Sequence, residues 1–274
     1  MTMTAADFDF LRDLVRQRTA IVLESNKAYL AETRLAPLAR RAGLPTVGAL
    51  VARMAREPDP RLNDEVVEAM ATNETFFFRD IHPFDALRQT VLPELMRKRA
   101  AERRLSIWCA ACSSGQEPYS VAMLIREHFP SLLAWDLHIV ASDISQAMLE
   151  RCRAGRYNAL EVNRGLPADH VLKYFRRDGL DWVLKDEVRR MIECRRLNLA
   201  EPWPMLPPAD VILMRNVLIY FDMETKRQVL AKVRRQLRPD GVLFLGAAET
   251  TLTIDESFER IQLERVSCYR LQQR

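Results

Sequence analysis

The most informative residue for chemistry is Glu117, a carboxylate at the start of a helix-like segment. It follows an apolar stretch, residues 105–111, and a small-residue loop, residues 113–115. Backbone amides at such a helix start commonly bind phosphate, which a carboxylate at the same place would repel. A cationic nucleotide fits better, and S-adenosylmethionine carries an ammonium and a sulfonium but no phosphate. The pattern therefore indicates a methyltransferase; an ordinary strand-to-helix turn is the alternative.

A second carboxylate, Asp143, ends another apolar stretch that begins at Leu137. In doubly wound sheets an acid at the carboxyl end of the strand after the loop accepts hydrogen bonds from ribose hydroxyls. The alternative is a helix N-cap ahead of the segment from Ser145 to Arg153. With the loop upstream, we expect Asp143 to contact ribose.

The elements that must position these acids alternate between strand and helix, which predicts an α/β, mostly parallel, doubly wound sheet. Proline-rich residues 202–208 separate two of the strands. Strands are expected at residues 105–111, 137–143, up to 197–199, from 209 to the polar residues at 215, at 242–246, and at 266–271 as an edge strand.

Two further parts flank this alternation. Residues 7–70 repeat apolar side chains at helical spacing, with Thr46 as an N-cap, which predicts a small all-α domain. Asp178 and Gly179 mark a hairpin turn in a small antiparallel β insert at about 155–190. We expect a helical domain and connector at 1–80 and a cofactor-binding methyltransferase domain at 81–274.

Bulk composition indicates a soluble globular protein. The 274 residues are 48% hydrophobic and 28% charged, which is ordinary for a folded chain. The start shows no basic segment with an apolar run, and no stretch approaches the ~20 apolar residues of a membrane span. We expect a cytoplasmic protein that does not insert into membranes.

The five cysteines are expected to be reduced. Cys109 and Cys112 form a C-x-x-C pair, for which a redox or zinc role is the alternative to small-residue packing beneath the loop. No second pair follows, and the four histidines show no ligand spacing, so we expect no metal.

Basic residues gather in two regions that the net charge of +4 conceals. One lies between Lys27 and Arg56 in the helical part, and the other lies in the insert. The alternatives are solvated helix faces or docking surfaces for an acidic partner. Candidate partner-binding residues are Arg34, Arg40, Arg41, Arg176 and Arg177.

Several motifs in order along the chain resemble the chemotaxis receptor methyltransferases, the CheR family. Each motif is weak by itself, but the set spans almost the whole chain. The motifs are Asn73-x-Thr75-x-x-x-Arg79, Cys112-Ser-Ser-Gly-Gln-Glu-Pro-Tyr-Ser120, Ala141-Ser-Asp143, Asn198-Leu199, Arg215-Asn-Val-Leu-Ile-Tyr-Phe-Asp222 and Leu237-x-Pro-Asp-Gly241.

The resemblance implies a helical N-terminal domain, a class I methyltransferase domain with a β insert, and methyl transfer from S-adenosylmethionine to glutamate side chains of chemoreceptors. Gln116 departs from the family, which often has a second Glu there. Cofactor-contacting residues implied by position are Asn73, Thr75, Arg79, Glu117, Asp143, Asn198, Leu199, Asn216 and Val217.

For the acceptor, we expect Arg79 or the hydroxyl of Tyr220 to hold the glutamate carboxylate; for Tyr220 the alternative is an aromatic at the end of the sheet. Phenylalanines 76–78 are expected to help exclude water. Family members that bind a receptor C-terminal pentapeptide carry a longer insert loop, so we expect independence from such a peptide.

Rival functions have distinguishing features. A nucleic-acid methyltransferase would suit the basic pI, but it should carry an aromatic-proline amine-binding motif where this chain has Arg215-Asn216-Val217. We therefore expect no nucleic-acid partner. A non-catalytic receptor adaptor should lack cofactor affinity. A dehydrogenase is disfavoured because G-x-G-x-x-G is absent.

Overall fold

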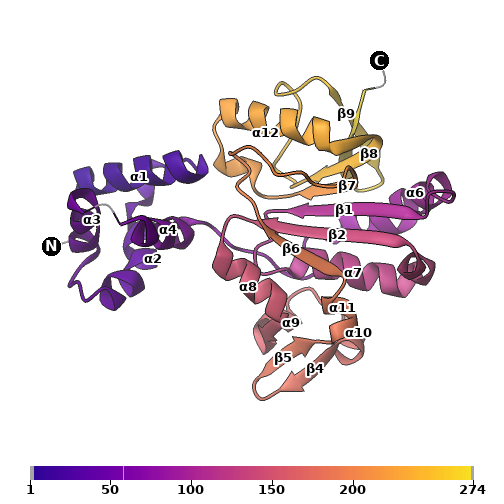
Figure 1. Cartoon of the computed structure of the whole chain (residues 1–274), viewed down its shortest axis with the longest axis horizontal. Helices are drawn as coiled ribbons and strands as arrows, with labels where there is room; N and C mark the ends of the chain where they lie inside the picture. The colour runs from indigo at the N-terminus through magenta and orange to yellow at the C-terminus, as the bar shows by residue number, and fades with distance from the viewer. Residues whose placement is uncertain (1–2, 58, 273–274) are drawn as a thin grey trace. The chain divides into compact units, whose positions relative to one another are not determined.

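Apolar strands pair into a seven-stranded sheet in the computed structural model, which describes residues 3–57 and 59–272 (Figure 1). The strand order is β6-β2-β1-β7-β8-β10-β9, and the first five strands run parallel. This confirms the doubly wound sheet. The bounds are β1 Arg104–Ala110, β2 Asp136–Asp143, β6 Ile192–Arg196, β7 Ala209–Met214, β8 Leu237–Leu245, β9 Phe258–Leu263 and β10 Val266–Leu271.

Helices cover both faces of this sheet. Helices α7 (Gln116–His128) and α8 (Gln146–Ala154) pack against β2 and β6, and α12 (Met223–Gln236) lies on the opposite side (Figure 1). An apolar helical run precedes β1, formed by α5 (His82–Ala86), the π-helical η2 (Leu87–Val91) and α6 (Leu92–Lys98). Short 3-10 helices are η3 (Pro130–Ala134) and η4 (Leu218–Tyr220).

Two expectations about strands are wrong. Strand β10 is not at the edge, because β9 pairs with it antiparallel and forms the edge itself. Strand β8 begins at Leu237 instead of Val242. The extra residues at its start fit the sheet because the register of β8 with β7 shifts between Ala209 and Val211. Strand β6, the strand expected up to 197–199, joins the main sheet beside β2.

The insert is a three-stranded sheet in the order β3-β5-β4, as the hairpin signal predicts. Its turn uses Gly179 at φ +65°, which glycine adopts without steric cost. Phe77, fully buried, packs edge-to-face against Tyr157 and Phe175 and so joins the insert to the main core. Bounds are β3 Arg156–Asn158, α9 Ala159–Asn163, α10 Ala168–Tyr174, β4 Phe175–Asp178, β5 Asp181–Leu184 and α11 Asp186–Arg189.

A buried ion network ties α6 to the amino-terminal ends of the strands. The Arg99 guanidinium lies 2.8 Å from Asp210 and donates to Asp240. Asp210 also accepts the backbone N–H of Ser106 at 2.8 Å. Hydrogen bonding to Arg99 lowers the pKa of Asp240. This network is structural, since it lies at the edge opposite the strand ends that bear the candidate ligand residues.

The chain divides into two compact units. The helical unit runs to Thr72 and includes Tyr220–Lys226, and the sheet unit comprises Asn73–Ile219 and the chain from Arg227. Residues 73–80, which the sequence places with the connector, group with the sheet unit.

The helical unit surrounds a small apolar core of its own. Thr46 caps α3 by accepting the N–H of Ala49, as expected, and Asp59 caps α4. Within the described ranges, no helix is long and apolar enough to span a bilayer. The helices of the helical unit are α1 Ala5–Thr19, η1 Ser25–Lys27, α2 Ala28–Arg41, α3 Val47–Arg56 and α4 Pro60–Met70.

Candidate functional site

Four neighbouring strands, β6, β2, β1 and β7, end at one edge of the sheet, and polar residues follow each of them. Asn198 follows β6, Asp143 ends β2, Glu117 lies in the first turn of the helix after β1, and Asn216 follows β7. Strand β1 is where the strand order of the sheet changes direction, because it pairs with β2 on one side and with β7 on the other. Ligands of doubly wound sheets bind at such a switch point.

The loop after β1 is held in an unusual backbone path. Ala111, Ser113 and Gly115 all have positive φ, at 55°, 50° and 97°. A Cβ placed on Gly115 would lie 2.4 Å from Cys152 Sγ. Core packing therefore requires glycine. Gln116, which differs from the Glu often found at this position in the resembling family, is buried. Its side-chain oxygen accepts a hydrogen bond from the Ser114 hydroxyl at 2.9 Å, which stabilises the loop.

Asp143 is buried and fixes the loop to the next strand end. Its Oδ2 accepts the N–H of Ser113 at 2.8 Å, and its Oδ1 accepts the N–H of Ser145 at 2.9 Å. The N-cap of α8 is Ser145, whose hydroxyl accepts from Met148, so capping is not the main role of Asp143. Asp143 thus presents a fixed carboxylate at the strand end where doubly wound sheets bind ribose.

Arg215 joins three of the sequence motifs and was not among the predicted site residues. Its Nη1 lies 2.8 Å from Glu117 Oε2, and its Nη2 lies 2.7 Å from Asp80 Oδ2 and 2.8 Å from the carbonyl oxygen of Arg79. The sequence did carry a signal, since an arginine at the end of a buried strand needs acidic partners. Two carboxylates against one guanidinium leave this group net negative, which suits a cationic ligand.

Glu117 keeps one oxygen available. Within the described part of the chain, Arg215 is its ion-pair partner through Oε2, and Oε1 accepts no hydrogen bond. Burial raises the pKa of the Glu117 carboxyl, and Arg215 opposes that rise. An ammonium group beside Oε1 would stabilise the ionised form further.

Glu249, also missed by the sequence, organises the segment after β7. Its carboxylate accepts backbone N–H groups from Gly246 at 2.6 Å, Asn216 and Val217 at 2.8 Å, and Ile219 at 3.2 Å. Asn216 has φ 59°, so its backbone conformation needs support. Glu249 thereby sets the positions of two residues predicted to contact the cofactor.

The stretch from Asn73 to Arg79 lies against the loop and the first turn of α7. The Asn73 carbonyl accepts the hydroxyl of Ser113 at 2.8 Å, and the Phe78 N–H donates to Ser120 Oγ at 2.9 Å. The guanidinium of Arg79 donates to the Glu74 carbonyl at 2.8 Å. These contacts bring the first and second motifs together.

The expectation that phenylalanines 76–78 form walls of the site is corrected in part. Phe77 is fully buried within the core described above, and Phe78 packs edge-to-face on Phe84. Phe76 remains half-buried, with the Arg164 guanidinium 4.3 Å from its ring centroid. Phe77 therefore serves core packing, whereas Phe76 and Phe78 are only partly buried.

Asn198 and Leu199 lie beside Asp143, because the N–H of Leu197 donates to the Asp143 carbonyl at 2.9 Å. Asn198 Oδ1 accepts the N–H of Ala200 at 3.0 Å, and Leu199 is buried. With Thr75, all residues implied as cofactor contacts belong to the sheet unit.

Tyr220 groups instead with the helical unit. Its carbonyl accepts the N–H of Val22 at 2.8 Å, and the next residue, Phe221, forms a β-bridge with Ile21. The structure describes Tyr220 within that unit, so its role toward the acceptor stays a prediction.

The cysteines are free thiols. Cys112 contacts Cys152, whose Sγ lies 3.4 Å from Cys194 Sγ, so the C-x-x-C pair is not a unit of its own. Mutual contact and burial raise the pKa of Cys194 above its ordinary value. Such thiols pack beneath the loop as small apolar groups.

The arrangement fits S-adenosylmethionine. Asp143 lies at the strand end where ribose is bound in such sheets, and Glu117 Oε1, which accepts no hydrogen bond from the described residues, can accept one from an ammonium. The net negative Glu117–Arg215–Asp80 group would repel phosphate and favour a cation.

Comparisons with known proteins agree with this geometry. Residues 6–71 match the family described as CheR methyltransferase, all-alpha domain, and residues 73–267 match CheR methyltransferase, SAM binding domain. Chemotaxis protein methyltransferase 1 of Pseudomonas aeruginosa is 40% identical over 98% of this chain and 99% of that protein. Cher2 of Pseudomonas putida is 39% identical over 93% and 94%, and the Vibrio parahaemolyticus protein 40% over 96% and 95%. The chain therefore belongs to the CheR family of chemotaxis methyltransferases, and its sheet unit is that family's S-adenosylmethionine-binding domain.

Proposed function

We propose that this protein transfers the methyl group of S-adenosylmethionine to glutamate side chains of chemoreceptor cytoplasmic helices, giving methyl esters. The observation that carries the proposal is the pair of acids at adjacent strand ends: Asp143 for ribose, and Glu117, balanced by Arg215, for the ammonium. Family membership supports the receptor as substrate, since the relatives are named chemotaxis protein methyltransferases.

The proposed cofactor contacts follow the strand ends. Asn198 and Leu199 lie beside Asp143, and Asn216 and Val217 are held by Glu249. Asn73, Thr75 and Arg79 complete the set from the segment that lies on the loop. Arg79 and Tyr220 are the residues proposed to hold the acceptor carboxylate.

The reaction needs no general base. Bound S-adenosylmethionine supplies an electrophilic methyl group, and a glutamate with an ordinary pKa near ~4.3 is already ionised at neutral pH. The chain contributes alignment, worth up to ~7–11 kcal/mol when the geometry is good, and exclusion of water from the acceptor. Too strong a pairing of Arg79 with the acceptor would stabilise the ground state and slow transfer.

Two exposed basic regions are proposed to meet the acidic receptor helix. In the helical unit, Arg40 is exposed, and Arg41 is exposed but pairs with Glu65 at 2.8 Å. Arg34 is less available, because it donates to the Met70 carbonyl at 2.6 Å. In the insert, Arg176 and Arg177 are exposed on β4.

The insert also bears on peptide binding. Strands β4 and β5 are joined by Gly179 and Leu180 alone, which is a tight connection. We therefore propose that methylation does not depend on a receptor C-terminal pentapeptide. The receptor substrate places the proposed site of action in the cytoplasm.

The test is radiolabelled methyl transfer to membranes that carry candidate receptors. Alkali should release the label as methanol, because esters hydrolyse in base whereas methylated amines do not. An Asp143→Asn variant is the control for cofactor-dependent transfer. Absence of alkali-labile transfer would overturn the catalytic proposal, and absence of S-adenosylhomocysteine binding as well would favour a non-catalytic adaptor.

A further inference from the structure

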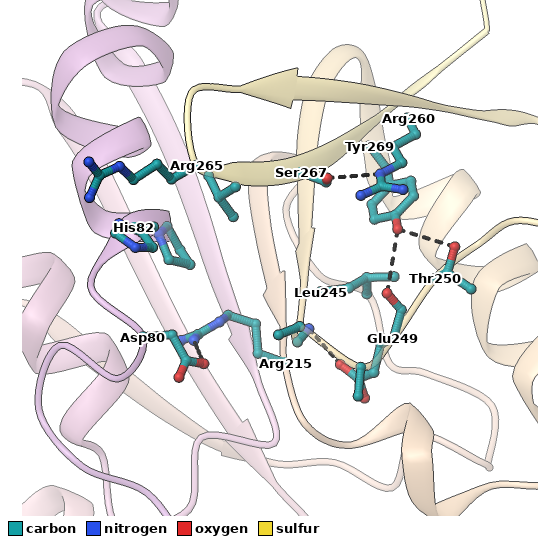
Figure 2. A pocket seen from close by; sticks show the side chains of 15 residues that line it. Asp80, His82, Arg215, Leu245, Glu249, Thr250, Arg260, Arg265, Ser267 and Tyr269 are labelled. Carbon is teal, nitrogen blue, oxygen red and sulfur yellow. Dashed lines mark hydrogen bonds and ion pairs between the residues drawn. The ribbon is translucent and has the colours of Figure 1, made fainter.

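A cavity of about 430 Å³ lies beside the strand ends, between the start of α5 and the β9–β10 hairpin (Figure 2). Its ionisable lining residues are Asp80, His82, Arg215, Glu249, Arg260 and Arg265. We call it the hairpin cavity.

The sheet register places the hairpin cavity at the same edge as the cofactor site. Strand β10 runs antiparallel to β8 with Tyr269 opposite Leu243, so the beginning of β10 lies at the carboxyl end of β8. Arg265 directly precedes β10, and Gly246 follows β8. Whatever enters the hairpin cavity therefore stands near the end of β7, where Asn216 and Val217 are proposed to contact the cofactor.

The acids of the hairpin cavity are already satisfied, whereas two of its cations are not. Asp80 pairs with Arg215, and Glu249 accepts four backbone N–H groups. Arg260 and Arg265 are exposed and have no ion-pair partner among the residues that the structure describes. Arg260 Nε donates to Ser267 Oγ at 2.8 Å, as Figure 2 shows. The opening of the cavity is therefore cationic.

A buried donor in the lining also lacks a partner. Arg215 is 6% exposed, and its Nε forms no hydrogen bond within the described part of the chain. Leaving such a donor unsatisfied costs ~1–3 kcal/mol, so an acceptor that reaches it gains binding energy. The Glu117–Arg215–Asp80 group as a whole is net negative, so the attraction for an acidic side chain comes from Arg260 and Arg265 at the opening, and Arg215 Nε offers one hydrogen bond to a carboxylate on a long side chain.

We propose that the hairpin cavity binds a second acidic side chain of the receptor helix, close to the glutamate being methylated. The inference rests on the proposed function and adds a specificity determinant to it. One unsatisfied donor matches one carboxylate oxygen better than a phosphate, which would need several donors. Charge attraction by Arg260 and Arg265 would steer the acidic helix and fix its register at the site.

The test variant carries both Arg260→Glu and Arg265→Glu. The control variant carries Arg97→Glu. Arg97 is also exposed, but it lies on α6 near the amino-terminal ends of the strands. We expect KM for receptor membranes to rise at least about tenfold in the double variant, with a weaker salt dependence. The affinity for S-adenosylhomocysteine should match wild type, and lysines at both positions should restore KM.

Distinct outcomes separate the possibilities. If wild type transfers no methyl to receptors, the proposed function fails. If wild type is active but the double variant has the KM of the Arg97→Glu control, the hairpin cavity proposal is overturned. Inhibition of wild type by millimolar inorganic phosphate, with an unchanged KM in the double variant, would also overturn it, because the cavity would then be a small-anion site.

Discussion

Glu249 offers the sharpest test of how the site is built. Its two carboxylate oxygens each accept two backbone N–H groups: Oε2 from Gly246 and Asn216, and Oε1 from Val217 and Ile219. A Glu249→Gln substitution keeps the shape but replaces one oxygen with an NH₂ group. Whichever way the amide turns, two backbone donors then face another donor.

The expected magnitude follows from these contacts. A hydrogen bond to a charged group contributes ~1.5–3 kcal/mol, so two lost bonds give an upper limit of about 3–6 kcal/mol. Relaxation of the segment after β7 recovers part of this, and we expect the free energy of unfolding to fall by about 2–4 kcal/mol. Because Asn216 and Val217 lose their support, affinity for S-adenosylhomocysteine should fall at least about tenfold.

Urea denaturation followed by tryptophan fluorescence measures the stability change. All four tryptophans, Trp108, Trp135, Trp182 and Trp203, belong to the sheet unit, so the signal reports that unit. Calorimetric titration measures the affinity. The matched control is Glu256→Gln, at an exposed position of the same unit, where we expect less than ~0.5 kcal/mol of change.

The reasoning is refuted if Glu249→Gln behaves as Glu256→Gln does in both measurements. Loss of stability with unchanged affinity would retain the structural role of Glu249 but refute its role in positioning Asn216 and Val217.

Three further predictions concern the site and the partner. Asp143→Asn should weaken S-adenosylhomocysteine binding by about 1–3 kcal/mol in calorimetry, because charge-assisted bonds to ribose are lost; unchanged affinity in a folded variant would contradict this. Since burial raises the pKa of Glu117, acidification should weaken the same binding at a higher pH than an ordinary glutamate would allow, and Glu117→Gln should abolish that dependence, as titrations across pH would show. Arg40→Glu with Arg41→Glu should lower receptor methylation and its salt sensitivity but not cofactor affinity; methylation indifferent to both reversals would exclude that surface.

The sequence by itself determined the class of fold and the main acids. Alternation of apolar strands and helices is a local signal, so the doubly wound sheet, the helical domain and the Asp178-Gly179 hairpin could be predicted. Glu117 and Asp143 could be identified because each stands directly after an apolar strand or loop, where the chain must reach the carboxyl edge.

Tertiary structure decided which strands are neighbours. Nothing in residues 266–271 shows that β9 lies outside them, because an edge strand and a covered strand can have the same composition. The same limit applies to β6, whose parallel pairing with β2 depends on contacts between residues far apart in the sequence.

Tertiary structure also decided which polar side chains meet. Arg215 was overlooked because its partners, Glu117 and Asp80, lie far from it in the sequence. Glu249 was overlooked because its partners are backbone N–H groups of the segment after β7. The requirement for Gly115 likewise comes from Cys152 on α8, which is far from it in the sequence. Sequence fixes local conformational preference, but burial and pairing of charge depend on distances that only the folded chain sets.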